Sequence, residues 1–129
     1  MSGLEAEGFR SSRVMEELAV VLARLSQREQ KAEITKTNAI FEIQLKNISG
    51  TEQSWTIDLK EGTGPAVSKG SATKVDATLI MDATFVEIAS GELEFQKAYL
   101  TGKLKIKGNV ILGSKLEHVL KIGQHKEHT

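Results

Sequence analysis

Three lysines lie within five residues near the C-terminal end of the chain, and such a cluster is a candidate anion site. Lys103, Lys105 and Lys107 alternate with Leu104 and Ile106 in the segment KLKIK. A spacing of two is also the period of a β-strand, whose successive side chains point to opposite faces. We favour this second interpretation, in which the lysines lie on the solvent-facing side of a sheet and the aliphatic residues on the other.

Candidate metal ligands lie at the C-terminal end. His125 and His128 flank Glu127 within a polar segment that offers no scaffold to hold them in a fixed geometry. A metal site needs ligands fixed by the surrounding structure, so we expect none here. His118 lies on the polar side of a predicted helix, where we expect it to be exposed.

The sequence contains no convincing catalytic motif. GTGPAV at 62–67 begins like a dinucleotide-binding loop, but it lacks the third glycine and the following helix, so we expect a turn. The segments KGSAT and LGSKL lack the G-x-S-x-G pattern of a nucleophile elbow. The carboxylates are scattered over positions that we expect to be exposed, and we expect no pair of them near an apolar pocket, as acid–base catalysis prefers. We therefore expect neither catalytic residues nor a cofactor.

Composition limits the partners that we expect. The 129 residues suit one domain, and the 17 basic and 17 acidic side chains balance to zero formal net charge. A chain without net charge has no long-range field that attracts nucleic acid. The chain has no cysteine, so disulfides and thiolate metal sites are excluded, and an intracellular location fits.

Targeting signals are also missing from the pattern. The start, MSGLEAEGFRSS, has acidic residues and no apolar core, so we do not expect a secretory signal. No apolar run approaches the roughly 20 residues that a membrane helix requires. We expect a soluble protein whose residues 1–10 form a loose leader and whose residues 124–129 form a polar tail.

Helical periodicity marks five segments. The first runs from Ser12, the expected N-cap, and its apolar stripe consists of Val14, Leu18, Val21, Leu22 and Leu25. Further helices are predicted over residues 26–37, 83–90, 94–100 and 110–122. Asp82 and Asn109 are the expected caps of the third and fifth helices, and Gly123 is the expected end of the last.

Alternation with period two predicts five strands, over residues 39–47, 54–60, 62–70, 75–81 and 103–107. The first two are expected to form a hairpin, and the third segment is expected to contain a short edge strand bracketed by turns. Phe41 and Trp55 share the aliphatic face, so the aromatic platform of an RNA-binding sheet is not predicted. Glu42 and Asp58 fall on the charged face as candidate cross-strand partners of the lysines. A sheet patterned in this way is covered by helices on one side only.

Two segments resemble the sterol carrier protein 2 family. SWTIDLK resembles the tryptophan-containing strand of that family, and QKAYLTGKLKIKGNVILGSKL resembles its most characteristic segment. The elements follow the same order over residues 12–122. The resemblance implies one domain over residues 1–129 with an α/β fold: a five-stranded mixed sheet, mostly antiparallel, covered on one face by helices. It further implies that three strands form an antiparallel meander, that the last two strands are parallel, and that a hydrophobic lipid tunnel lies between helices and sheet.

The resemblance also implies a function. Members of the family bind fatty acids, fatty acyl-CoAs and sterols without catalysis, touch membranes transiently and move lipids between them. By this resemblance we expect a monomer in the cytoplasm or the peroxisome, although the final residues, Glu127-His128-Thr129, do not form the small-basic-leucine tripeptide of many peroxisomal relatives.

Candidate ligand-binding residues come from two sources. The resemblance implies Gln96, Tyr99, Leu100, Ile111, Leu112, Leu116, Val119 and Leu120. The apolar pattern adds Trp55, Phe85, Ile88 and Ile106. Gly113 and Ser114 stand where some relatives have bulkier residues, which would alter the width of the tunnel.

Two other functions remain open at this point. The domain could be a protein-interaction or regulatory module with a fully packed interior, because periodicity does not distinguish a filled core from a cavity. It could also be a small acyl-CoA-acting enzyme, such as a thioesterase. A cavity in the structure would argue against the first, and a thiol-release assay tests the second.

Overall fold

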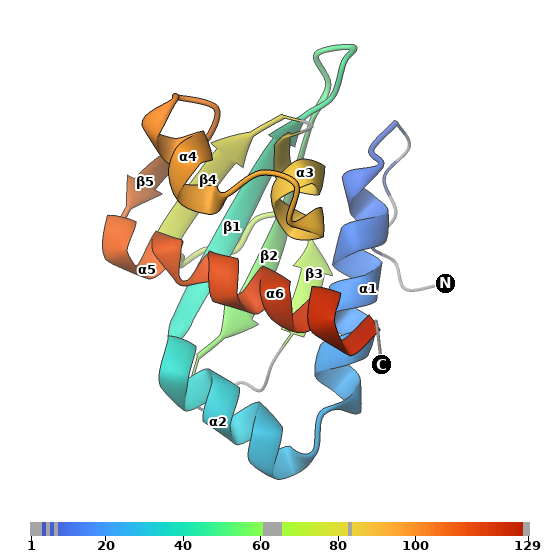
Figure 1. Cartoon of the computed structure of the whole chain (residues 1–129), viewed down its shortest axis with the longest axis vertical. Helices are drawn as coiled ribbons and strands as arrows, with labels where there is room; N and C mark the ends of the chain where they lie inside the picture. The colour runs from blue at the N-terminus through green and yellow to red at the C-terminus, as the bar shows by residue number, and fades with distance from the viewer. Residues whose placement is uncertain (1–3, 5, 7, 61–65, 83, 128–129) are drawn as a thin grey trace.

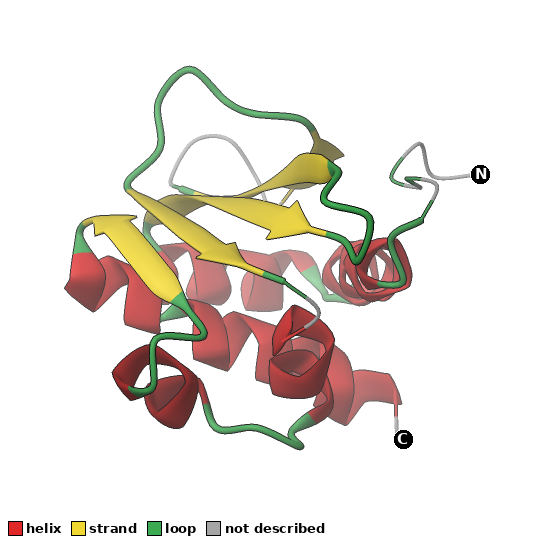
Figure 2. Ribbon diagram, turned by 90° about the horizontal axis from the view of Figure 1, so that it is seen from above, coloured by secondary structure: helices red, strands yellow, loops and turns green. Residues whose placement is uncertain are grey.

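A computed structural model describes the chain except residues 1–3, 5, 7, 61–65, 83 and 128–129. It also leaves out the side chains beyond residue 122. The elements are α1 (Ser11–Arg24), α2 (Gln27–Thr37), β1 (Ala39–Lys46), β2 (Glu52–Leu59), β3 (Ala66–Lys69), β4 (Ala77–Met81), α3 (Thr84–Ser90), α4 (Phe95–Leu100), β5 (Lys105–Gly108), α5 (Val110–Ser114) and α6 (Leu116–Glu127). They form two layers, a twisted sheet and a set of helices that covers one of its faces (Figures 1 and 2). This arrangement confirms the predicted α/β class.

The five strands lie in the order β3-β2-β1-β4-β5. Strands β1, β2 and β3 form the predicted antiparallel meander. The expected parallel pairing of the last two strands is wrong, because β4 runs parallel to β1 and β5 runs antiparallel to β4. Helices α3 and α4 connect β4 to β5, and a helical connection between neighbouring strands is compatible with either direction.

The apolar face of the sheet forms the core, as the alternation predicted. Its fully or almost fully buried residues include Phe41, Ile43, Leu45, Trp55, Ile57, Leu59 and Leu79. The helices contribute Leu18, Leu22, Phe85, Ala98, Leu116 and Val119 to the same cluster. Alternate strand residues share one face, so the apolar set is buried under the helices. The residues between them lie on the other face, where Glu42 and Thr56 are also largely covered.

The lysine segment lies on the outside of the molecule, as predicted. Lys103, Lys105 and Lys107 are all exposed. The prediction that Glu42 and Asp58 are cross-strand partners of these lysines is wrong, because β5 pairs with β4 rather than with β1 or β2. Lys107 lies opposite Thr78, and Lys105 opposite Ile80.

Glu42, one of those carboxylates, has other partners. It is 7% exposed, and its Oε2 accepts hydrogen bonds from Gln44 Nε2 at 2.8 Å and from Ser71 Oγ at 3.1 Å. A buried carboxylate is tolerated because these donors replace water.

The N-terminal segment that was expected to be loose contributes to the core in its described part. Leu4 and Phe9 are 4% and 8% exposed. Trp55 Nε1 donates a hydrogen bond to the Leu4 carbonyl oxygen at 2.9 Å. Phe9 meets the Trp55 ring edge to face, with ring centroids 5.7 Å apart. Two isolated apolar residues show no periodicity, so the sequence pattern did not reveal this contact.

Two predicted helix ends differ from the structure. Helix α1 begins one residue before Ser12, and the Ser12 hydroxyl donates to the Phe9 carbonyl at 2.7 Å instead of capping the helix. The last predicted helix is divided at Lys115 into α5 and α6, and α6 continues through Gly123 to Glu127. A glycine inside a helix costs only about 1 kcal/mol, so packing elsewhere along α6 outweighs it. The expected polar tail is therefore helical as far as it is described.

The other two predicted caps are present. Asn109 Oδ1 accepts from Leu112 N at 3.0 Å, and Asp82 Oδ1 accepts from Thr84 N at 2.9 Å and from Thr84 Oγ1 at 2.6 Å. These hydrogen bonds satisfy donors at the starts of α5 and α3 that have no partner within the helix.

We expect the ionisation of Asp82 to make the free energy of unfolding depend on pH. Its bonds to Thr84, chiefly to the side chain and then to the backbone, lower the pKa of the Asp82 carboxyl below its usual 3.8. A carboxyl group whose pKa is lower in the folded state than in the unfolded state stabilises the fold at pH values above its unfolded-state pKa. This stabilisation is lost as the pH falls through the folded-state pKa. We expect Asp82→Asn to reduce the free energy of unfolding at neutral pH and to match the parent well below pH 3.8.

Urea unfolding at both pH values measures this difference. Glu92→Gln, which removes an exposed carboxylate after α3, serves as the control. A constant difference between Asp82→Asn and the parent at all pH values would contradict the role of ionisation.

Candidate functional site

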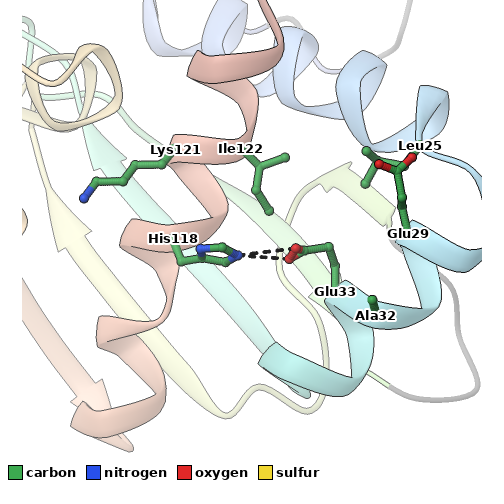
Figure 3. Close-up of a pocket in the computed structure, with 7 residues that line it drawn as sticks. All are labelled: Leu25, Glu29, Ala32, Glu33, His118, Lys121 and Ile122. Atoms are coloured by element: carbon green, nitrogen blue, oxygen red, sulfur yellow. Dashed lines mark hydrogen bonds and ion pairs between the residues drawn. The ribbon is translucent and has the colours of Figure 1, made fainter.

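A pocket of about 490 Å³ lies between α2 and α6, next to the end of α1 (Figure 3). Its lining residues are Leu25, Glu29, Ala32, Glu33, His118, Lys121 and Ile122. Ligand pockets in proteins commonly have volumes of roughly 300–1,000 Å³, so this one is large enough for a small molecule.

Most of the pocket surface is apolar, but four of its seven lining side chains are polar or charged. We call these four, Glu29, Glu33, His118 and Lys121, the charged rim. Leu25, Ala32 and Ile122 provide the apolar part, and Ile122 points from α6 toward α2 (Figure 3). Lys121 extends away from α2 in the same view. Such a surface favours an apolar ligand with a solvated polar end, because it offers little to fix a headgroup.

A polar pair joins the two helices across the pocket. His118 Nε2 lies 3.0 Å from Glu33 Oε1 and 3.3 Å from Oε2. The His118 side chain is 41% exposed and that of Glu33 is 17% exposed. His118 is therefore partly exposed, as expected, but it also has a partner on α2 that the sequence did not predict.

A second connection joins the start of α6 to the end of α2. Lys115 Nζ lies 3.3 Å from the Lys36 carbonyl oxygen and 3.4 Å from that of Thr37. These carbonyls belong to the last turn of α2, where a cation is favoured by the helix dipole. Lys115 thus fastens α6 to α2 next to the pocket, although it does not line the pocket itself.

Helix α6 separates the pocket from the core. Leu116, Val119 and Leu120 are at most 5% exposed and belong to the core cluster. His118 and Ile122 line the pocket on another face of the same helix. A shift of α6 would therefore connect the pocket with the apolar layer between the helices and the sheet.

The structure separates the twelve sequence-predicted ligand residues into three groups. Six are buried in the core cluster: Trp55, Phe85, Ile88, Leu116, Val119 and Leu120. Ile106 and Leu112 are half-buried against that cluster. The remaining four are exposed: Gln96, Tyr99, Leu100 and Ile111. None of the twelve lines the pocket between α2 and α6.

Gly113 allows α5 to pack closely on the sheet. A Cβ atom at this position would lie 2.9 Å from Ile106 Cγ2 and 3.7 Å from Ala77 Cβ. Gly113 is buried, whereas Ser114 is exposed. The absence of a side chain at position 113 thus allows α5 to approach Ile106 of β5 closely.

Sequence reasoning missed the residues of the pocket because no local pattern joins them. Glu33 and His118 are 85 positions apart, and both occupy the polar faces of predicted helices. The one available signal was Ile122, which continues the apolar residues of α6 toward its C-terminal part.

A one-sided sheet covered by helices, with an apolar-lined pocket between two of them, is the architecture of a small α/β ligand-binding protein. Comparison with known proteins gives the family. Residues 18–121 match the model of the SCP-2 sterol transfer family. The chain belongs to this family of lipid-binding and lipid-transfer proteins, as the sequence resemblance predicted.

Individual relatives span nearly the whole chain. The oleate-induced peroxisomal protein POX18 of Candida maltosa is 40% identical, with 92% of each chain covered. A fatty acid-binding protein of Yarrowia lipolytica is 39% identical over 95% of this chain and 97% of the relative. The structure of sterol carrier protein 2 from Yarrowia lipolytica in its apo form superposes with a TM-score of 0.85, at 37% identity, covering 96% of this chain and 98% of that one.

Among the described residues, no helix has the length and apolar character needed to cross a membrane.

Proposed function

We propose that this protein binds fatty acids, fatty acyl-CoAs and sterols without covalent chemistry and carries them between membranes. The observation that carries the proposal is the apolar-lined pocket between α2 and α6 in a chain of the SCP-2 sterol transfer family. The fatty acid-binding relative from Yarrowia lipolytica supports the choice of ligand class.

Burial of the alkyl chain supplies the affinity. Each methylene removed from water contributes about 0.8 kcal/mol, so a sixteen-carbon chain gains roughly 12 kcal/mol before costs. The loss of free motion and the ordering of a flexible chain offset part of this gain. We expect a dissociation constant of about 1 µM, near −8 kcal/mol.

The charged rim suits several headgroups. Glu33 already engages His118, and the Lys121 side chain extends away from α2. No rigid donor set is thus available among the described pocket residues for one particular headgroup. We expect selectivity for the length and width of the apolar part, and weak selectivity for the polar end.

Helix α6 is the movable wall in this proposal. An alkyl chain enters the pocket beside Ile122 and displaces α6 from the sheet. It then contacts the buried members of the predicted ligand set, above all Leu116, Val119 and Leu120, together with Phe85 and Ile88. Release occurs when a membrane loosens the same helix.

The remaining functional expectations belong to this proposal. The protein acts as a monomer in the cytosol or the peroxisome, and the peroxisomal relative from Candida maltosa supports the second location. It does not cleave acyl-CoA, so a thiol-release assay with palmitoyl-CoA should give no signal above background. Thiol release that depends on the protein would favour the thioesterase alternative.

Competition with a fluorescent fatty acid tests the proposal directly. We expect saturable binding of the probe and its displacement by palmitate, palmitoyl-CoA and cholesterol. Palmitic acid methyl ester should compete nearly as well as palmitate, because the rim does not fix the headgroup. Absence of saturable binding at tens of micromolar (far above the micromolar affinity that burial predicts) would overturn the proposal and favour a packed interaction module.

A further inference from the structure

One edge of the molecule exposes an unusual group of apolar side chains. Tyr99 and Leu100 at the end of α4 are 40% and 73% exposed, and Val110 and Ile111 at the start of α5 are 43% and 76% exposed. Strand β5 lies between these helices, and the three elements share one edge of the molecule in both views (Figures 1 and 2). We call α4, β5 and α5 the β5 edge.

The β5 edge is also locally basic. Residues 97–116 contain five lysines and no acidic residue, although the whole chain has zero net charge. Lys97, Lys103, Lys105 and Lys107 are exposed. Lys115 is occupied at the last turn of α2, and Lys103 lies close enough to Asp82 to help lower its pKa. Lys97, Lys105 and Lys107 take part in none of the salt bridges between described residues.

Exposed aliphatic residues and lysines together match the chemistry of an anionic bilayer. Lysines are attracted to the negative surface potential of such a membrane, and their aliphatic stems can lie along its apolar boundary. Leu100 and Ile111 gain by leaving water for the acyl region, and a tyrosine is favoured at the interface. Nucleic acid would engage the lysines but would leave the aliphatic side chains in water.

We propose that the β5 edge docks this protein onto membranes that carry anionic lipids. This inference rests on the proposed carrier function, because docking places the pocket near the bilayer that gives or receives the lipid. Only Lys115 separates α5 from α6. Insertion of Val110 and Ile111 would therefore pull on the residue whose amine fastens α6 to α2. Docking and opening of the pocket are joined through this short connection.

Vesicle binding by the ligand-free protein tests the docking surface. The parent should sediment with phosphatidylcholine vesicles that contain phosphatidylserine, and much less with phosphatidylcholine alone or at high salt. Both the Leu100→Asp/Ile111→Asp variant and the Lys105→Glu/Lys107→Glu variant should bind the anionic vesicles about tenfold more weakly or worse. Ile48→Asp is the matched control, since Ile48 is fully exposed at the β1–β2 turn, and it should bind as the parent does.

Ligand binding without vesicles separates this inference from the carrier proposal. The Lys105→Glu/Lys107→Glu and Ile48→Asp variants should bind the fluorescent fatty acid like the parent, because none of their changed residues lines the pocket. Loss of vesicle binding only in the lysine variant would indicate a purely electrostatic contact, and it would overturn the bilayer assignment. Equal losses with Ile48→Asp, or none with either β5-edge variant, would also overturn it. Failure of the parent to bind the fatty acid would overturn the carrier proposal. The docking proposal would then be tested by vesicle binding alone.

Discussion

Replacing Ala32 with tryptophan should weaken fatty acid binding by at least about tenfold, a loss of 1.4 kcal/mol or more. Ala32 is exposed on α2 and lines the pocket opposite α6. An indole at this position would occupy space that we assign to the entering alkyl chain. Because the change adds apolar volume to an open space, it should not strain the core. Competition with the fluorescent fatty acid measures the affinity, and circular dichroism checks the fold.

A matched control is available on the neighbouring helix. Ala23 is also an exposed alanine within a helix, but it does not line the pocket. Ala23→Trp should leave the affinity unchanged, so that any effect of a surface tryptophan as such is accounted for. Unchanged affinity in a folded Ala32→Trp variant would place the lipid outside the pocket between α2 and α6.

Replacing Trp55 with alanine should give the largest loss of stability, about 3–5 kcal/mol. The Trp55 side chain is fully buried, donates a hydrogen bond to the Leu4 carbonyl oxygen and packs edge to face against Phe9. Its removal would leave a large cavity and would also release the described N-terminal residues from the core. The free energy of unfolding of domains of this size is commonly about 5–15 kcal/mol, so this loss would be a large part of it.

Trp55→Phe divides this effect into its parts. Phenylalanine retains most of the apolar contact but cannot donate to Leu4, so we expect a loss of roughly 1–2 kcal/mol, although the smaller ring adds a packing cost. Urea unfolding followed by circular dichroism measures both variants, since the change removes the only tryptophan. A loss below about 1 kcal/mol for Trp55→Ala would show that Leu4 and Phe9 do not depend on this side chain.

The sequence was sufficient to predict most elements of the fold, because their signals are local. Alternation in β1 and β2, the apolar stripe of α1 and the caps Asp82 and Asn109 each depend on residues close together in the chain. Periodicity determines which face of an element is apolar, and the apolar face is the one that becomes buried. The family resemblance added the antiparallel meander of the first three strands, but it gave the wrong direction for the last pair.

The candidate site was decided by the tertiary structure. The pocket exists because α6 lies beside α2, with Glu33 and His118 brought together from distant positions. The contact between Leu4 and Trp55 and the parallel pairing of β1 with β4 likewise join distant segments. These contacts depend on how whole elements pack, and packing depends on the shapes of all neighbouring side chains at once. A pattern confined to one element determines its buried face, whereas the partner of that face is determined only when the complete chain folds.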